Sequence, residues 1–532
     1  IVFFEAGQPG LAPISEGWDK YHGAEADYDG GLASAPSSEL GVMSLGHDGL
    51  LGKSSVSSFF REKVSSIVEI STNRGALLKV TKRHPLLTLS EGKLQWKSSG
   101  LITEGDCIAS ASAMHVDGKD SISTDEAYFL GLFVAEGTSN PLSITNFDGK
   151  INAKLHHFMR SAFGEEPKFY PDKGRTLLHK NSWKILGKLA FSNSATKFVP
   201  AEVIAGTDEL VKSFLSGYID GDGYLSNCPE LCTKSPLLAS HLTYLLARLG
   251  VTSSIKTKMV KDSVFYRVFV AVQESKEKLR GVLIYATKMP QSVTGGSTMK
   301  RTAFGAPASA VGALLKRIHG RLSGTVRRNT RFGKKELHLA GYLSLYNNYI
   351  GKRPVYKAIP EESLKLAVKL YDEKLSAMGR RYEELAMPSS DNILAAMTEL
   401  PFQNEVIYSK LGMKKSAFEN YFVRGVPQER QKKIAEAIRQ EIAALASDKE
   451  LLADLKTLRM LAYGDFGWER VESINEMPYN DYVYDMTVDG THNFVGGSKP
   501  MLLHNSQVGF QLSLNVQKPV EQGGLGGNTL FV

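Results

Sequence analysis

The sequence predicts a multidomain protein in which an all-β domain is split by an inserted α+β domain and a mainly helical region. Short alternating runs of strand-forming residues fill residues 1–120, and the same pattern returns over 463–505. Helical apolar runs appear in the middle of the chain instead. The 532 residues are enough for about three or four domains of roughly 100–200 residues each. We therefore expect one β-domain made from the two ends, interrupted by an α+β domain at 121–275 and a helical region at 276–462.

The composition excludes several classes of protein. Hydrophobic residues make up 42% of the chain and charged residues 23%, so a disordered, collagen-like or coiled-coil protein is not expected. Three cysteines are too few for a disulfide framework, which indicates a reducing, cytoplasmic setting. No apolar run approaches about 18 residues and the start has no basic segment, so neither a membrane span nor a secretory signal is expected. The net charge of +8 favours a polyanionic partner, and we expect a monomer.

The first 120 residues carry the pattern of a small β-domain. Alternating segments at 65–70 and 77–80 are typical of strands, and turn residues separate them at short spacing. Residues 1–5 also predict a strand. Residues 16–40 are polar and rich in Gly, Ser and Ala, which predicts an exposed loop.

An internal repeat marks the inserted α+β domain. Phe129–Gly137 and Leu215–Gly223 are two copies of one pattern: a helix with small residues on one face that ends in an acid and a glycine. The copies begin 86 residues apart, which leaves room for one αββαββα half-domain. Close packing of the two helices would place Glu136 and Asp222 side by side, where they could hold Mg²⁺ or Mn²⁺ that activates water against a phosphodiester. The alternative is a pair of capped core helices without catalysis.

Basic residues indicate a DNA-binding surface in the helical region. Residues 300–335 hold ten Lys or Arg and no Asp or Glu. An apolar helix, a Gly turn and a basic second helix over 404–437 predict a helix-turn-helix. The alternatives are a solvated basic face and an ordinary pair of bundle helices. The residues expected to contact phosphates are Arg317, Arg321, Arg327, Arg328, Arg331, Lys334, Lys335, Lys414 and Lys415.

The tripeptide His504-Asn505-Ser506 carries a self-cleavage chemistry. An Asn amide can attack its own backbone carbonyl and cut the chain after itself, assisted by the preceding His, and the Ser hydroxyl can accept an acyl group. Upstream, Thr81 and His84 lie three residues apart at the end of a strand, where both could reach one scissile peptide. Asp485 and His492 belong to a second such block near the end of the chain.

This set of blocks, in this order, resembles the splicing blocks of inteins, which have a Hint-type all-β fold. The resemblance implies that Thr81 and His84 activate the upstream junction and that Asp485 and His492 coordinate the later steps. It implies that His504 assists the cyclisation of Asn505 and that Ser506 is the second nucleophile. Inteins begin with Cys or Ser, so we expect a few residues, the first nucleophile among them, to precede Ile1. A hedgehog-type autoprocessing domain is the alternative, and the tripeptide and the repeat argue against it.

The repeat itself resembles the LAGLIDADG homing endonucleases that are often inserted in inteins. Supporting segments are Lys197–Pro200 before the second copy and Leu245–Val251 after it. The resemblance implies that Glu136 and Asp222 are metal ligands, that Lys197 is a charge-stabilising catalytic lysine, and that double-stranded DNA is the partner. An inactive, DNA-binding endonuclease remains the rival.

Residues 506–532 resemble the segment that follows the phosphate loop of the archaeal recombinase RadA. This resemblance implies a short host stub in which Ser506 is also the phosphate-loop hydroxyl that meets Mg²⁺. The Gly-rich loop and its Lys are absent, so we expect ATP to bind only the spliced host and no cofactor-binding site here. The expected DNA target is the RadA gene site without the intein. A chain capable only of C-terminal self-cleavage is a further alternative.

Overall fold

The computed structural model describes residues 1–28, 30–164, 166–186, 189, 193–225, 228–288, 305–322, 358–400 and 404–505. The backbone forms two compact units. The first comprises residues 1–88, 96–299 and 465–532, and the second comprises residues 89–95 and 300–464. No helix among the described residues is both long enough and apolar enough to cross a membrane.

The two ends of the chain form one β-sheet region, as the sequence predicts. The main path runs β2-β1-β5-β6-β21-β10-β23-β8-β9, so β21 from the end of the chain lies between two strands from its beginning. The strands of this path are β1 (Val2–Glu5), β2 (Gln8–Leu11), β5 (Leu40–Leu45), β6 (Leu51–Thr72), β8 (Pro85–Ser90), β9 (Lys93–Ser98), β10 (Cys107–Ala111), β21 (Phe466–Val488) and β23 (Met501–His504). Off this path, β7 (Leu77–Val80) pairs with β6, and β22 (Asn493–Gly496) pairs with β23.

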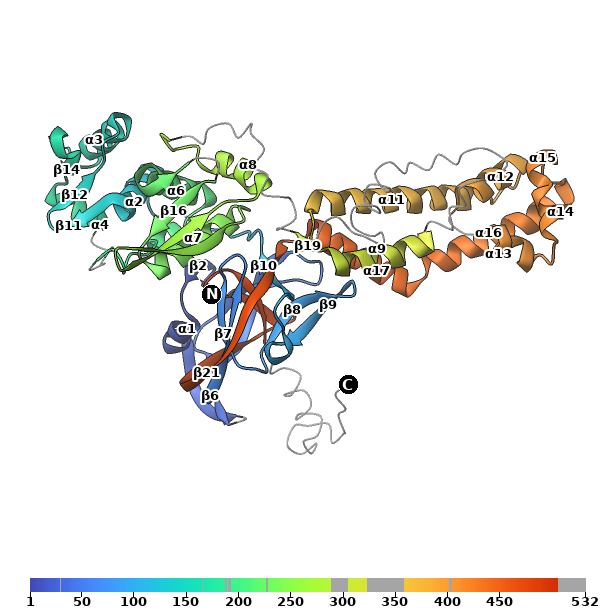
Figure 1. Cartoon of the computed structure of the whole chain (residues 1–532), viewed down its shortest axis with the longest axis horizontal. Helices are drawn as coiled ribbons and strands as arrows, with labels where there is room; N and C mark the ends of the chain where they lie inside the picture. Colours follow the sequence, from blue (N-terminus) through green and yellow to red (C-terminus); the bar gives the residue numbers. More distant parts are fainter. Residues whose placement is uncertain are drawn as a thin grey trace. The chain divides into compact units, whose positions relative to one another are not determined.

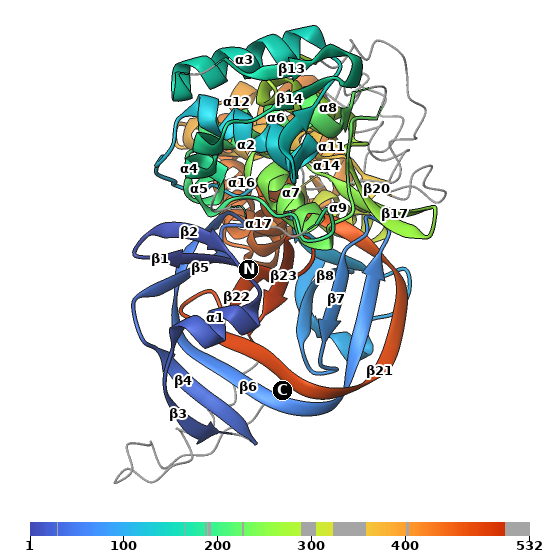
Figure 2. The same ribbon diagram turned by 90° about the vertical axis from the view of Figure 1, so that its left-hand side faces the viewer.

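The longest pairing joins β6 to β21. The two strands are antiparallel from Val56 opposite Val488 to Thr72 opposite Val471, with three register shifts that let the ribbon bend. Figure 2 shows both strands curving together through the β-region. Their inner faces contribute to one apolar core, which includes Phe59, Ile70 and Met486. Burial of this core stabilises a domain whose halves are about 400 residues apart in sequence.

The structure corrects the prediction of an exposed loop at 16–40. This segment forms α1 (Ile14–Tyr21) and a hairpin of β3 (His22–Tyr28) and β4 (Gly31–Pro36). Trp18 of α1 is only 1% exposed, and β4 pairs with β6. Gly, Ser and Ala have weak strand propensity, so the sequence of this hairpin does not show a strand pattern. β4 forms because β6 offers it a hydrogen-bonding edge.

The inserted α+β region consists of two halves with the same order of elements, α-β-β-α-β-β-α. The first half has α2 (Thr124–Glu136), β11 (Gly137–Ser139), β12 (Leu142–Thr145), α3 (Gly149–Phe163), β13 (Lys168–Tyr170), β14 (Arg175–Leu177) and α4 (Trp183–Leu186). The second half, which the short α5 (Ala201–Ala205) precedes, has α6 (Asp208–Asp222), β15 (Gly223–Tyr224), β16 (Glu230–Thr233), α7 (Pro236–Arg248), β17 (Ser254–Val260), β18 (Ser263–Phe269) and α8 (Gln273–Val282). Each half builds a four-stranded sheet.

The expected boundary at 275/276 falls inside α8. Its polar sequence hides the helix, yet Leu279 and Val282 are buried in the core of the α+β region. The region therefore continues beyond the boundary expected from the sequence.

Helices α2 and α6 pack against each other more closely than side chains would allow. A Cβ on Gly131 would lie 2.0 Å from the carbonyl oxygen of Phe214, and a Cβ on Gly217 would lie 2.0 Å from that of Tyr128. Ser123 and Glu126 form a capping box at the start of α2, and the Thr207 side chain caps α6. The two glycines therefore set the distance between the helices.

We expect Gly217→Ala to lower the free energy of unfolding of the α+β region by about 1–3 kcal/mol, because the added methyl group forces the helices apart. The measurement is the urea midpoint at which the amides of α2 and α6 lose protection from hydrogen exchange. Gly149→Ala in α3 is the matched control, since nothing lies within 4 Å of its added Cβ. Equal midpoints for the two variants would contradict the close approach.

The second unit is mainly helical. Figure 1 shows α11 lying along α16 and α17. Its helices are α9 (Ala308–Leu322), α11 (Glu361–Glu384), α12 (Ser390–Glu399), α13 (Asn404–Lys410), α14 (Lys415–Glu419), α15 (Tyr421–Arg424), α16 (Gln428–Ala446) and α17 (Lys449–Tyr463), and β19 (Ala306–Pro307) pairs with β20 (Ala358–Ile359). The second helix of the expected helix-turn-helix, α14, has only five residues, and α15 follows it almost directly.

Candidate functional site

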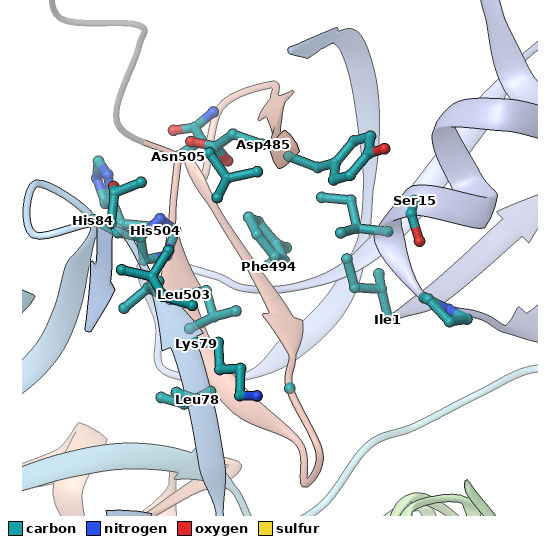
Figure 3. Close-up of a pocket in the computed structure, with 18 of the residues that line it drawn as sticks. Ile1, Ser15, Leu78, Lys79, His84, Asp485, Phe494, Leu503, His504 and Asn505 are labelled. Atoms are coloured by element: carbon teal, nitrogen blue, oxygen red, sulfur yellow. The ribbon is translucent and has the colours of Figure 1, made fainter. Parts of the chain in front are cut away.

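A cavity of about 1120 Å³ lies in the first unit, between the β-region and α7. Five of the residues expected to act in splicing line it: Thr81, His84, Asp485, His504 and Asn505. Figure 3 shows His84, His504, Asp485 and Asn505 on elements from both ends of the chain. Helix α7 adds a wall that the sequence did not indicate, and there the Tyr244 hydroxyl donates to the carbonyl oxygen of Gly497 at 3.0 Å.

Thr81 and His84 lie in a tight turn between β7 and β8. The His84 amide donates to the Thr81 carbonyl at 3.1 Å, and the Ser99 hydroxyl donates to the same carbonyl at 2.6 Å. His84 is buried, and burial followed by the nearby His504 lowers its pKa to about 4. Its Nε2 has no hydrogen-bond partner within the described part of the chain. The turn thus offers a neutral imidazole with one free nitrogen.

Asn505 is buried at the end of the β22–β23 hairpin. Its backbone amide donates to the carbonyl oxygen of His492 at 3.0 Å. Its side chain lies between the same carbonyl and the Val488 amide: with the nitrogen facing His492 and the oxygen facing Val488, the distances are 2.9 and 2.8 Å. His492 adopts a left-handed backbone with φ of 54°, which is uncommon for a residue other than glycine. The turn that contains His492 therefore holds Asn505 through backbone groups.

His504 stands beside Asn505 and packs on an aromatic residue of β9. The centroids of the His504 and Trp96 rings are 4.7 Å apart. Burial is the largest cause that lowers the His504 pKa to about 4. A hydrogen bond with the Asn505 backbone raises this pKa, and the charge of His492 lowers it further. The imidazole is therefore neutral at pH 7, and its Nδ1 is buried without a hydrogen-bond partner in the described structure.

The remaining splicing residues have different positions. Asp485 lies on β21 opposite Phe60, and its Oδ1 accepts from the Met486 amide at 2.8 Å. His492 does not line the cavity and contacts Asn505 through its carbonyl. Ser506 lies outside the described residues, together with the remainder of the stub.

The burial of His504 predicts how the rate of cleavage after Asn505 depends on pH. Because only a neutral imidazole can accept a proton, we expect cleavage after Asn505 to stay constant from pH 8 to about 5 and to fall near pH 4. Trp96→Ala admits water to the ring and moves the inflection towards about 6.5, which slows cleavage about tenfold at pH 5.5. The assay is the first-order release rate at each pH, with Trp96→Phe as the control. A wild-type inflection near 6.5 would disprove this account of burial.

Two carboxylates lie at the adjacent ends of α2 and α6. A Cβ on Gly221 would lie only 3.1 Å from Cγ of Glu136, so the end of α6 is in contact with the Glu136 side chain. Burial, and then the charge of Asp222, raises the Glu136 pKa to about 6; burial also raises the Asp222 pKa. The surroundings of both carboxylates therefore disfavour their ionised forms.

Two lysines flank this acid pair in the same way. Lys197 Nζ donates to the carbonyl oxygen of Ala135 at 2.9 Å, and Lys288 Nζ donates to that of Gly221 at 3.2 Å. Both lysines lower the pKa values of both carboxylates. Lys288 was missed by the sequence analysis, although the repeat was a signal: a lysine at a similar distance after the second acid matches Lys197 after the first.

The acid pair fits a divalent cation that also contacts a substrate. Among the described residues, no group of three or more His, Cys, Asp or Glu could hold a metal alone. Mg²⁺ is commonly bound by one or two carboxylates together with substrate phosphates and water. Burial disfavours the ionised forms of Glu136 and Asp222 and raises the pKa of both, and a bound cation would favour the ionised forms.

Two of the basic residues expected to bind DNA form ion pairs with acidic residues of the second unit. Arg317 donates to both carboxylate oxygens of Asp454, at 2.8 and 3.0 Å, and Arg321 pairs with Glu450 and Asp448. The phosphate contacts expected at these two positions stay a prediction, and they would compete with these ion pairs. Lys414 is exposed, and Lys415 lies 3.8 Å from Glu419. The other predicted residues, Arg327, Arg328, Arg331, Lys334 and Lys335, lie outside the described residues.

Curated proteins and solved structures resemble this chain. The replication factor C small subunit of Thermococcus kodakarensis is 24% identical over 91% of the chain and 60% of that protein. The DNA polymerase of Thermococcus litoralis is 28% identical over 28% of the chain and 9% of that protein. The crystal structure of the TvoVMA intein matches with 22% identity and a TM-score of 0.19, covering 21% of this chain and 65% of that one. The chain spans about 60% of the length of the replication factor C subunits from Thermococcus and Pyrococcus.

The family comparison covers most of the chain. A family model described as the intein splicing domain matches residues 37–505. Its match begins near β5 and ends at Asn505, so it includes the five candidate splicing residues that line the cavity. The chain therefore belongs to the intein splicing domain family.

Proposed function

We propose that this chain is a self-splicing intein that cleaves itself at Asn505. The observation that carries the proposal is the convergence of Thr81, His84, His504 and Asn505 on one cavity. In the cleavage step, Nδ2 of Asn505 attacks its own backbone carbonyl carbon. The peptide bond to Ser506 breaks, the proton lost by Nδ2 passes through the solvent-shielded site to the leaving amine, and a succinimide ends the upstream product. Neutral His504 serves as the proton carrier.

The upstream pair acts on the other junction in this proposal. The Thr81 hydroxyl and the His84 imidazole hydrogen-bond to the scissile peptide there. Before Asn505 cyclises, the Ser506 oxygen attacks the upstream acyl group, which is carried as an ester or thioester on the first nucleophile of that junction, and the Ser506 proton goes to the departing hydroxyl or thiol. Asp485 and His492 arrange the block that joins the two junctions. The shared cavity supports this assignment because both ends of the excised segment must reach one site.

The test is mass spectrometry of the purified full chain during incubation. We expect release of a peptide that begins at Ser506, and an upstream product one water lighter than the hydrolysed chain because it ends in a succinimide. Release of an upstream product with a free carboxylate from the earliest time would indicate hydrolysis, and the cyclisation proposal would fail.

A second activity is supported by the acid pair. We infer that residues 121–288 form a LAGLIDADG-type homing endonuclease that cuts double-stranded DNA. Glu136 and Asp222 would hold Mg²⁺ or Mn²⁺, which when bound polarises the phosphate and lowers the pKa of water. Lys197 and Lys288 stabilise the negative charge that develops on the phosphate. The close helix packing favours this interpretation over two ordinary core helices, because it brings two incompletely neutralised carboxylates together at the ends of the helices.

The host is proposed to be the recombinase RadA. This assignment depends on residues 506–532 alone, and the relatives reported above are named as a DNA polymerase and as small subunits of replication factor C. In this proposal the intein acts as a cytoplasmic monomer, ATP binds only the spliced host, and the DNA target is the RadA gene site without the intein.

The DNA-cleavage proposal is tested with a plasmid that carries this uninterrupted site. We expect linear product with Mg²⁺ or Mn²⁺ and none with EDTA. Tight binding without cutting in any divalent metal would show that the endonuclease is inactive and that the chain is only a DNA-binding intein.

A further inference from the structure

A second carboxylate on α6, Asp220, is fully buried two residues before Asp222. Its oxygens accept hydrogen bonds from three groups. The Tyr128 hydroxyl donates at 2.6 Å, the Thr287 amide at 2.7 and 3.0 Å, and the Lys288 amide at 2.8 Å. Backbone amides that donate to a carboxylate form strong hydrogen bonds where water is excluded. Asp220 therefore fixes the backbone of Thr287 and Lys288 to α6.

The segment before Lys288 is anchored as well. Lys154 Nζ donates to the carbonyl oxygen of Tyr285 at 2.8 Å, and the Tyr285 hydroxyl donates to Glu209 at 2.8 Å. These two contacts hold the chain as it leaves α8, and Asp220 holds the two residues at which the lysine side chain begins. The Lys288 side chain then reaches back to Gly221.

The two halves of the α+β region differ at this point. The position of α2 that matches Asp220 in the repeat is Val134, which is buried and apolar. The other lysine is instead held by the N-cap residue of α7: the Ser235 hydroxyl donates to the carbonyl oxygen of Lys197 at 2.6 Å. The two similar lysines are thus positioned by different contacts: a buried carboxylate holds the Lys288 backbone, and a serine hydroxyl holds the Lys197 backbone.

We propose that Asp220 is a positioning residue that sets Lys288, and through it the cleavage of one DNA strand. This inference rests on the proposed endonuclease function. A duplex has two antiparallel strands, and the region has two lysines, one after each repeated acid, beside a shared acid pair, so each lysine acts on one strand while the two acids hold the cation together. The position of Lys288 depends on Asp220, whereas that of Lys197 does not.

The first measurement needs neither metal nor DNA. In Asp220→Asn one acceptor oxygen becomes an amide donor that faces the backbone N–H groups, so we expect hydrogen exchange at Thr287 and Lys288 to become at least about tenfold faster. Ser235→Ala is the matched control, and it should leave this segment protected. Unchanged exchange at both amides in Asp220→Asn would overturn the proposal.

The second measurement separates the two strands. A duplex with the uninterrupted site carries a different fluorophore on each strand. Asp220→Asn should slow cleavage of one strand about 10²-fold, because misplacing a catalytic group by about 1 Å has an effect of that size. On a plasmid, nicked circles should accumulate. Lys288→Ala should slow the same strand, and the double variant should be no slower than Lys288→Ala alone. Ser235→Ala should slow the opposite strand.

The outcomes distinguish this inference from the function on which it rests. If the wild-type chain never cuts the duplex, the endonuclease proposal fails, and the inference about strand cleavage fails as well. If the wild type cuts and Asp220→Asn slows both strands equally, Asp220 has only a structural role. Equal thermal unfolding of the variants and equal affinity for the duplex serve to exclude a general loss of structure.

Discussion

Glu136→Gln and Asp222→Asn are each expected to abolish DNA cleavage while leaving DNA binding nearly intact. Each acid would supply several kcal/mol of transition-state stabilisation by holding the cation, and at about 1.36 kcal/mol per factor of ten the loss is about 10³-fold or more. Binding depends on many phosphate contacts, so it should persist and weaken steeply with salt. Because burial raises the pKa of Glu136 to about 6 without a cation, protons should compete with Mg²⁺ near that pH, and cleavage at low Mg²⁺ should fall first as the pH drops. The assay is plasmid cleavage with Mg²⁺, beside a binding titration.

The control for this prediction is Asp125→Asn. Asp125 is an exposed acid in the first turn of α2, far along the helix from Glu136, and this variant should cut as the wild type does. If the Glu136 and Asp222 variants cut as fast as this control, the carboxylates are structural and the metal assignment is wrong.

Asn505→Ala is expected to stop release of the peptide that begins at Ser506 altogether, because it removes the attacking nitrogen. Asn505→Asp is the sharper variant, since it keeps the shape of the side chain and replaces only the nucleophilic nitrogen. His504→Ala should retain slow release, because it removes a proton carrier, whose contribution is about 10²–10⁴-fold, and leaves the bond-forming atom in place. Release is followed by mass spectrometry over days.

Asn475→Ala provides the comparison for these variants. Asn475 is exposed on β21, so its loss leaves the cavity unchanged and release should continue at the wild-type rate. Succinimide-ended product from Asn505→Asp or Asn505→Ala would show that another residue attacks, and the assignment of Asn505 would have to be abandoned.

The sequence located the candidate reactive residues more successfully than their surroundings. Thr81 with His84, and His504 with Asn505, form short local motifs, and the structure places all four on one cavity. The wall from α7 and the packing of Trp96 on His504 join segments far apart in the chain, so no local pattern could indicate them.

The charged residues show the same limit. The acid-free stretch around Arg317 indicated a phosphate-binding surface, but its partner Asp454 lies 137 residues further along the chain. An ion pair of this kind depends on tertiary packing and leaves no local signal. The loop expected at 16–40 failed for a related reason, because its hairpin depends on an edge of β6 for pairing.

The pairing of β6 with β21 has a consequence for synthesis of the chain. A ribosome that adds about 5–20 residues per second makes β21 roughly 20–80 s after β6, since about 400 residues separate them. Asn505 and the strand that leads to it are made later still, so the cavity around Asn505 is completed only after β23 has been translated. Ala111 and Phe466 flank the inserted region and pair with each other, so an insert that folds first would bring its two flanks together. This replaces closure of a long flexible loop by closure of a short one, which speeds docking of the last strands once they emerge.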